Sequence, residues 1–344
     1  MSFRIKNRAD KERGAILLTT LLVMGLMATL AVAMMDDVRF GMKRTGNVQS
    51  NAQAQWYAIA AQDFSRAYLQ ENVAKIKPRH LNPALLTMAT SEPIIFPIEG
   101  GAISLSVRGG SQCVSLGSLA SAPGQRQMSN LLIALGHMDA DAKNLVAAAI
   151  DWQDADDQIQ PSGGAEDGAY LGLSPAYRTP NTAFSSVMEL RALRGMDEKI
   201  YQSLRPFICA RPKTETAKIN INGLSLEQAP VLASVLGPNQ LELAAQLISQ
   251  RPPAGYTSYE GLKAAPAMEG AQTKNIDFDN IIYLPEYIWV EAQILYQGAR
   301  RSVVIDYAIS GGKTRPVYRS YSQQARRPII EVSDISEGVS GEPL

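Results

Sequence analysis

The longest apolar stretch of the chain lies near its start, where Ala15 to Met35 are 21 consecutive uncharged and mostly apolar residues. As an α-helix that rises about 1.5 Å per residue, this stretch spans roughly the 30 Å hydrocarbon core of a bilayer. Five basic and only two acidic residues precede it. Because positive charge resists translocation, the pattern predicts a single-pass membrane helix with the first residues cytoplasmic and the bulk of the chain exported.

The apolar pattern continues beyond this stretch. Apolar residues recur every four positions, as on one face of a helix, at Val48, Ala52, Trp56, Ala60, Phe64 and Tyr68. No proline lies between Gly14 and Pro78. We therefore expect one helix of roughly 50 residues, with a loosening around Gly41–Gly46.

A cleaved secretion signal is the alternative interpretation, because Ala31-Val32-Ala33 has the small-x-small pattern of a cleavage site. The apolar run is long for a signal, however. A signal that is discarded also has no reason to be joined to an amphipathic helix. The pattern favours a helix that is retained.

Short strand-like segments flank the middle of the chain. Residues 92–107 read as two strands around Gly100-Gly101, and residues 287–295 and 301–308 read as two more around a Gln297-Gly298 turn. Residues 318–322 add a further candidate strand. We expect a small antiparallel sheet that buries its apolar face against the long helix, which makes the fold α+β.

Between the two groups of strands the pattern becomes helical. Helical spacing covers residues 131–152, 186–193, 226–236 and 241–251. The block contains a faint repeat, in which an alanine-rich helix, a polar loop and an aromatic residue precede another helix start. Ser186 with Glu189, and Thr257 with Glu260, match the capping-box spacing at these helix starts. The pattern predicts a large all-α domain of SAM-like or helix-hairpin-helix-like repeats inserted into the sheet domain.

Charge argues against nucleic acid as a partner. Lysine plus arginine number 33, and so do aspartate plus glutamate. Helix-hairpin-helix modules that bind DNA need cations directed at phosphates. The first loop of the repeat instead carries Asp154, Asp156, Asp157, Glu166 and Asp167. We interpret the repeat as a packing unit and expect no nucleic-acid binding.

The start of the chain resembles the type IV pilin superfamily in its short basic leader, its glycine, its hydrophobic helix and its amphipathic extension. The resemblance implies cleavage by prepilin peptidase after Gly14 and methylation of the new amino terminus at Ala15. Pilins commonly carry glutamate as the fifth mature residue, and here that position is Thr19. A buried carboxylate needs a partner from a neighbouring subunit. A neutral residue therefore suits a subunit at the end of a filament, and drift or an unprocessed leader is the alternative.

A narrower resemblance covers nearly the whole chain. The pilin-like start, the helical insertion, the Asp151–Met196 stretch and the segment "KININ" are similar to the type II secretion system minor pseudopilin K, or general secretion pathway protein K. The resemblance implies an inner-membrane protein of a Gram-negative bacterium with the bulk of its chain in the periplasm. It also implies a tip complex with minor pseudopilins I and J on a periplasmic pseudopilus of the major pseudopilin. That filament drives folded proteins through the outer membrane, and further contacts would involve the inner-membrane assembly platform, the secretin or the cargo.

This resemblance and the pattern together divide the chain into five parts. The division is a leader (1–14), a membrane and filament-core helix (15–37), a pilin-like α+β domain (38–115 and 280–325), an inserted helical domain (116–279) and a flexible tail (326–344). The alternatives are a minor pilin-like protein of a type IV pilus or DNA-uptake system, and a membrane-anchored periplasmic binding domain.

The acidic loop is the candidate cation site. Asp154, Asp156 and Gln158 copy the alternate spacing that starts an EF-hand, but Ile159 occupies its central glycine position and Glu166 comes one residue late. From spacing alone a solvated acidic loop is an equal alternative. The resemblance to pseudopilin K implies a structural calcium ion, for which we expect the ligands Asp154, Asp156, Gln158, Glu166 and Asp167. Asp151 is expected to be capping or paired.

The chain has two cysteines, Cys113 and Cys209. In an oxidising compartment they could form a disulfide that closes a loop of about 96 residues and stabilises the fold by about 4–5 kcal/mol. Two buried free thiols are the alternative, and spacing does not decide between them.

Catalytic patterns are weak. The segment "SGGKT" imitates the end of a phosphate-binding loop, but Tyr307 stands where its first glycine is required, so we expect a hairpin turn. His80 and His137 lack metal-ligand spacing. We expect no enzyme, and an exported hydrolase is the catalytic alternative.

Overall fold

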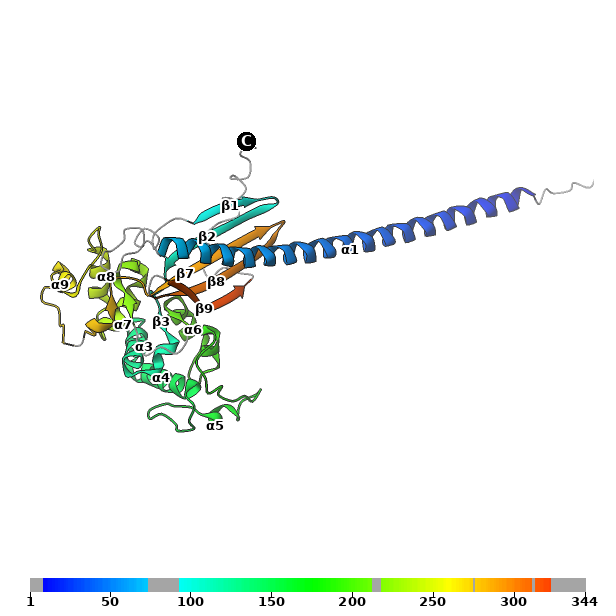
Figure 1. The fold of residues 1–344 in the computed structure, drawn as a ribbon. Helices are drawn as coiled ribbons and strands as arrows, with labels where there is room; N and C mark the ends of the chain where they lie inside the picture. Colours follow the sequence, from blue (N-terminus) through cyan, green and yellow to red (C-terminus); the bar gives the residue numbers. More distant parts are fainter. Residues whose placement is uncertain (1–8, 74–92, 212–217, 275, 311–312, 323–344) are drawn as a thin grey trace, which may run out of the picture.

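The structure is a computed structural model that describes residues 9–73, 93–211, 218–274, 276–310 and 313–322. Several predictions lie outside these residues: the first part of the leader, His80, the two glycines of "SGGKT" and the polar tail. Figure 1 shows a long helix that leads into a sheet, with a helical domain beside the sheet.

Helix α1 is a single unbroken rod of 65 residues, Ala9–Val73. The loosening expected around Gly41–Gly46 is absent from this described helix, because isolated glycines weaken a helix by only about 1 kcal/mol each and do not break it. The rod is long and apolar enough to cross a membrane, and no residue of its most apolar window is buried.

The sheet has five antiparallel strands in the order β1-β2-β7-β8-β9. They are β1 (Ile94–Ile98), β2 (Gly101–Gly109), β7 (Tyr287–Tyr296), β8 (Ala299–Ser310) and β9 (Lys313–Ser322). All of the predicted strands are confirmed, and β9 begins earlier than its pattern indicated. The antiparallel pairing of β8 with β9 confirms that "SGGKT" separates two hairpin strands.

Helix α1 packs its second half on this sheet through small side chains. Ala54, Ala58 and Ala61 are buried, and they share one core with residues of β7 and β8 that include Val303 and Tyr307. The stripe of apolar residues at every fourth position is a different face of the helix. Small residues let the helix approach the sheet closely; of the large residues in the stripe, Tyr68 packs against the edge of this core, whereas Trp56 and Phe64 are exposed.

The inserted domain lies between β2 and β7 and has its own core. Its helices are α3 (Ala122–Ala134), α4 (Asp139–Gln153), α5 (Asp167–Tyr170), α6 (Glu198–Leu204), α7 (Ala229–Leu236), α8 (Leu241–Ser249) and α9 (Tyr259–Lys263). Two short parallel pairs join β3 (Val114–Ser115) to β4 (Ile208–Cys209) and β5 (Ile219–Asn220) to β6 (Ile281–Ile282).

The capping boxes and helix bounds predicted for the insert are confirmed only in part. The Ser186–Glu189 capping box is confirmed, although it starts a 3-10 helix at Val187–Ala192. The second predicted box at Thr257 was wrong, because Ser258 caps α9 by accepting a hydrogen bond from the Gly261 backbone N–H (3.1 Å). The continuous pattern over residues 131–152 is two helices, since the chain turns at Gly136, whose φ is +88°.

Candidate assembly surface and cation loop

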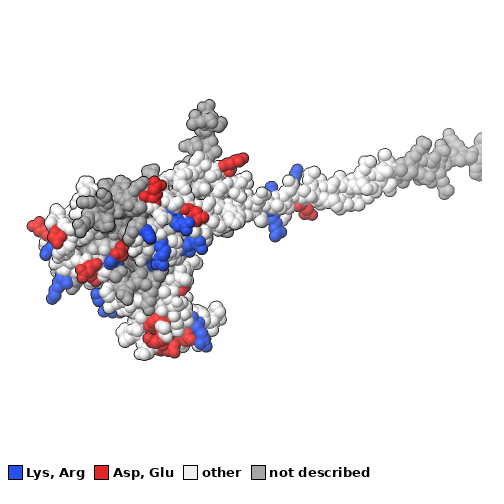
Figure 2. Space-filling model, viewed as in Figure 1, with Lys and Arg blue, Asp and Glu red and all other residues white. Residues whose placement is uncertain are grey.

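The first half of α1 exposes a large apolar surface. In Figure 2, the part of this rod that is drawn in white before residue 36 has no charged side chains, and it is followed by a charged band formed by Asp36, Asp37, Arg39, Lys43 and Arg44. Among the exposed residues before this band are Leu17, Leu18, Leu21, Leu22, Met24, Met27, Leu30 and Met34. Such a surface is stable only in lipid or against other apolar helices.

A second apolar surface continues along the half of α1 that packs on the sheet. Trp56 is 66% exposed and Phe64 is 47% exposed, although both lie on the predicted stripe. Phe64 reaches the sheet edge, where its ring meets that of Phe96 in β1 edge-to-face, with ring centroids 5.2 Å apart. Ile94 and Ile95 of the same edge strand are also exposed. This surface, which we call the outer stripe, links the rod to the edge of the sheet.

The acidic loop begins at the end of α4 with a fully buried carboxylate. Both oxygens of Asp151 accept hydrogen bonds from the Gln160 backbone N–H, at 3.1 and 3.2 Å. Burial raises the pKa of Asp151 above its usual value. The loop approaches so closely that a Cβ at Gly164 would overlap the Asp151 carboxylate. Asp151 therefore folds the loop back onto α4.

Glu166 is the least satisfied group of the loop. Its side chain is only 6% exposed, and no hydrogen-bond donor in the described part of the chain reaches either carboxylate oxygen. Burial, followed by the negative charges of Asp151 and Asp154, raises the pKa of Glu166 to about 7. A buried, partnerless carboxylate beside other carboxylates is chemically suited to a hard cation.

Two of the other predicted ligands, Asp156 and Asp167, have hydrogen-bond partners. Asp156 accepts a hydrogen bond from the Gln158 backbone N–H (2.9 Å). Asp167 accepts from the hydroxyl of Thr179 (2.9 Å) and pairs with Arg178 (3.1 Å). Among the described residues, no three acidic, histidine or cysteine side chains converge as a ready-made metal site. Each of these carboxylates still keeps acceptor capacity.

An aromatic cluster is formed by residues that flank the acidic loop in the chain. The Trp152 ring packs edge-to-face on Tyr170 and Tyr177, with ring centroids 5.5 and 6.2 Å apart. Its indole N–H lies 3.4 Å from a Glu189 carboxylate oxygen. The sequence analysis did not predict this cluster or the clasp, by which we mean the contacts of Arg178 and Thr179 with Asp167. The only available signal was the density of aromatic residues after Asp167. Together the cluster and the clasp fix both ends of the loop.

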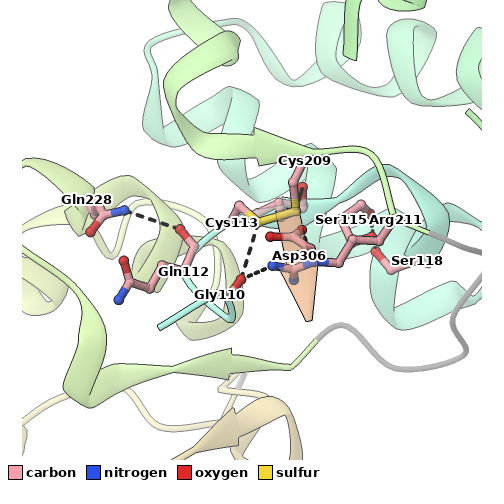
Figure 3. Close-up of a disulfide and its surroundings, with 10 residues drawn as sticks. Gly110, Gln112, Cys113, Ser115, Ser118, Cys209, Arg211, Gln228 and Asp306 are labelled. Carbon is pink, nitrogen blue, oxygen red and sulfur yellow. Dashed lines mark hydrogen bonds and ion pairs between the residues drawn. A yellow bond between two sulfur atoms is a disulfide. The ribbon is translucent and has the colours of Figure 1, made fainter. Parts of the chain in front are cut away.

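A disulfide joins Cys113, which follows β2, to Cys209 of β4. We call this junction between the insert and the sheet the neck. Figure 3 shows the disulfide beside a buried ion pair, in which Arg211 Nε donates to Asp306 Oδ2 at 3.0 Å. The parallel pairing of β3 with β4 brings the two cysteines together. The disulfide therefore closes a loop within the insert close to the end of β2, and the Arg211–Asp306 ion pair ties the insert to β8 of the sheet.

The remaining candidate residues have structural surroundings. Gly14 and Ala15 lie within α1. His137 lies in the turn between α3 and α4, where its ring Nε2 is 3.1 Å from the hydroxyl of Ser203 in α6. The Ser203 hydroxyl donates its proton to the Ile200 carbonyl oxygen (2.7 Å), so the His137 ring does not accept it as a general base in this arrangement.

Comparison with known proteins points to one family. Two family models, both described as type II secretion system protein K, match residues 112–213 and 219–279. Type II secretion system protein K of Pectobacterium carotovorum is 31% identical over 91% of this chain and 97% of its own length, and that of Klebsiella pneumoniae is 33% identical over 76% and 82%. A crystal structure of the GspK-GspI-GspJ complex of enterotoxigenic Escherichia coli contains a chain of similar fold. Its TM-score is 0.69 at 24% identity, over 81% of this chain and 99% of that chain.

Proposed function

The chain belongs to the type II secretion system protein K family and is a minor pseudopilin, and we propose that it occupies the tip of a periplasmic pseudopilus. There it would start the filament, limit its growth and help to drive folded proteins across the outer membrane. We propose that it acts by assembly and not by catalysis.

The observation that carries the tip position is the inserted domain. It is a second body with its own core, attached beside the α1–sheet unit (Figure 1). Pilin-like subunits stack along a shaft by repeating one interface, and a side domain of this size would collide with the neighbours of such a stack. The end of a filament is the position that tolerates it.

Thr19 supports the same position. In a shaft, a buried carboxylate at this point of the helix could pair with the amino terminus of the next subunit. A terminal subunit lacks one such neighbour, so a neutral side chain avoids a charge without a partner.

We propose that the outer stripe and the apolar rod contact the helices of minor pseudopilins I and J. The crystallised protein of similar fold forms a complex with partners of those names. Trp56 and Phe64 supply large exposed rings, and such rings are enriched at protein interfaces. Contacts with the major pseudopilin would use the rod, where apolar packing replaces lipid.

Labelling of pseudopili tests the tip position. We expect an antibody against the insert to mark one end of each filament, and raised expression of this protein to give more and shorter filaments. Labels spaced regularly along the shaft would refute a tip position.

We propose that prepilin peptidase removes the leader after Gly14 and that the mature chain is held in the inner membrane with its bulk in the periplasm. N-terminal sequencing of membrane-extracted protein should begin at Ala15. A start at Met1 would indicate a plain membrane anchor, and a start at Met34 would indicate signal-peptidase release.

We further propose that the acidic loop binds calcium, with a structural role and with Asp154, Asp156, Gln158, Glu166 and Asp167 as ligands. The buried and partnerless Glu166 carboxylate supports this proposal. Bound calcium would supply the positive charge that the clustered carboxylates lack, and the chain would supply the oxygen ligands. Isothermal titration of the calcium-free protein should show saturable binding that Glu166→Gln weakens at least tenfold.

A further inference from the structure

The charged band of α1 comes directly after the apolar run, which ends at Met35. All five of its charged side chains are exposed, and none of them takes part in an ion pair among the described residues. Three of the five are cations, namely Arg39, Lys43 and Arg44. Cations within about 15–20 residues of a membrane span oppose export of the side that carries them. Under the proposed topology these cations are on the exported side, so a favourable interaction there has to offset their cost.

The cations lie mainly on the side of α1 that faces the sheet. Lys43 precedes the buried Ala54 by 11 residues, or about three turns, so both lie on one face of the helix. Arg39 is one turn before Lys43 on the same side. Val38 instead precedes Trp56 by 18 residues, or five turns, and it continues the apolar outer stripe on the other side. Partner helices that pack on the outer stripe therefore leave the cations uncovered.

The cations also lie at the height of phospholipid headgroups when the apolar run fills the hydrocarbon core. The first buried residue of α1 after that run is Ser50, whose hydroxyl donates to Gln297 Oε1 (3.0 Å). At about 1.5 Å per residue, Ser50 lies about 21 Å beyond Asp36, and Lys43 lies about 10 Å beyond it. The headgroup layer is roughly 5–8 Å thick on each side of a bilayer. Helix side chains tilt toward the N-terminus, so the long basic side chains reach back into this layer.

We propose that the charged band binds the phosphate groups of anionic phospholipids in the periplasmic leaflet through Arg39, Lys43 and Arg44. This inference rests on the proposed retention of α1 in the inner membrane and names the lipid that α1 selects there. With Asp36 and Asp37 the band carries a net charge of +1, so it attracts a headgroup that is negative overall. A zwitterionic headgroup gains less, because its own ammonium group is repelled. The contact fixes the depth of the stored subunit and is broken when α1 enters a filament.

Quenching of one tryptophan placed in the band tests the proposal. Phe40 is 69% exposed and lies between Arg39 and Lys43 in the chain, so Phe40→Trp puts a reporter at the headgroup layer. The native Trp56 lies about 30 Å beyond Asp36, outside the bilayer. The full chain with this change is reconstituted into phosphatidylcholine vesicles. The quencher in these vesicles is acyl-brominated phosphatidylglycerol or acyl-brominated phosphatidylcholine.

We expect half-maximal quenching at a mole fraction of brominated phosphatidylglycerol that is about fivefold lower than that of brominated phosphatidylcholine, because one net charge near the surface contributes about that factor. This preference should shrink at about 1 M salt, where the screening length is about 3 Å. The basic leader residues are on the opposite side of the bilayer, roughly 30 Å away, and do not enrich lipid around the reporter.

Charge variants in the same background separate the cations from the helix that carries them. The triple variant Arg39→Gln, Lys43→Gln and Arg44→Gln should remove the preference for phosphatidylglycerol. Arg66→Gln is the matched control, because Arg66 is also an exposed cation of α1 but lies in the half that packs on the sheet. It should keep the original preference.

The double variant Asp36→Asn and Asp37→Asn should raise the preference by at least another fivefold. Quenching by brominated phosphatidylcholine reports that α1 is in the bilayer, which separates two kinds of failure. If neither lipid quenches, the inference falls together with the proposed membrane placement. If both lipids quench equally, or if the triple variant keeps the preference, this inference alone is overturned. A triple variant that keeps the preference but no longer co-purifies with partner pseudopilins would assign the cations to a partner protein instead.

Discussion

Replacing Glu166 by glutamine should flatten the pH dependence of folding stability measured without calcium. The ordinary pKa of this carboxyl is 4.5, and in the folded chain it is about 7. A carboxyl group with a raised folded pKa stabilises the fold while it is protonated. That contribution is complete below pH 4.5 and is lost as the pH rises through 7.

The size of the effect follows from this window. Between about pH 5.5 and 8, wild type should lose roughly 2 kcal/mol from this group, because one unit of pKa difference corresponds to about 1.4 kcal/mol. Glu166→Gln has no proton to release and should not show that loss. Asp151 titrates in both proteins, so its contribution largely cancels from the comparison.

Urea unfolding of the full chain in detergent and a chelator, followed by tryptophan fluorescence, measures the effect. Glu242→Gln, at an exposed position in the first turn of α8, is the matched control and should follow wild type. With calcium present the trend should reverse in wild type, since the ion competes with the proton for Glu166. If Glu166→Gln and wild type lose equal stability over this pH range in chelator, the reasoning about Glu166 is wrong.

Three further changes test the fold and its surfaces. Replacing both Cys113 and Cys209 by serine should lower the free energy of unfolding by about 4–5 kcal/mol, and denaturant midpoints that match the oxidised wild type would contradict this. Gly164→Ala should destabilise the loop by about 1–3 kcal/mol, because its Cβ would overlap the Asp151 carboxylate, and calorimetry should show weakened calcium binding. Trp56→Ala should change the free energy of unfolding by less than about 0.5 kcal/mol yet reduce co-purification with partner pseudopilins. Replacing the buried Leu69 by alanine should lower the free energy of unfolding by about 2–5 kcal/mol. A large stability loss for Trp56→Ala would place that ring in a core.

Periodicity and turn chemistry predicted the rod and the sheet. An unbroken apolar pattern without proline requires one helix, and the Gln297-Gly298 turn, with both φ values positive, defines the β7–β8 hairpin. Periodicity did not identify the buried face of α1. Both faces are apolar there, and side-chain size decided the outcome, since Ala54 and Ala58 fit against the sheet while Trp56 does not.

The loop and the neck were predictable only in part. Carboxylate spacing located the acidic loop, but the clasp of Asp167 by Thr179 joins residues that are twelve positions apart and leaves no periodic signal. The disulfide depends on the pairing of β3 with β4, two strands of two residues each. Strands this short carry no pattern, so the meeting of the two cysteines could be stated only as an alternative.

The way in which the chain leaves and re-enters the sheet has a mechanical consequence. Gly109 at the end of β2 pairs with Ile288 near the start of β7, so the insert departs and returns on adjacent strands. A force applied along α1 is transmitted to the sheet through the contacts of α1 with β7 and β8, and the hydrogen-bonded strands carry it. The insert is attached to the side of this path, and the Cys113–Cys209 bond crosslinks its first residues to β4 in its middle. Force on α1 can therefore move the inserted domain without stretching the inserted domain's own hydrophobic core.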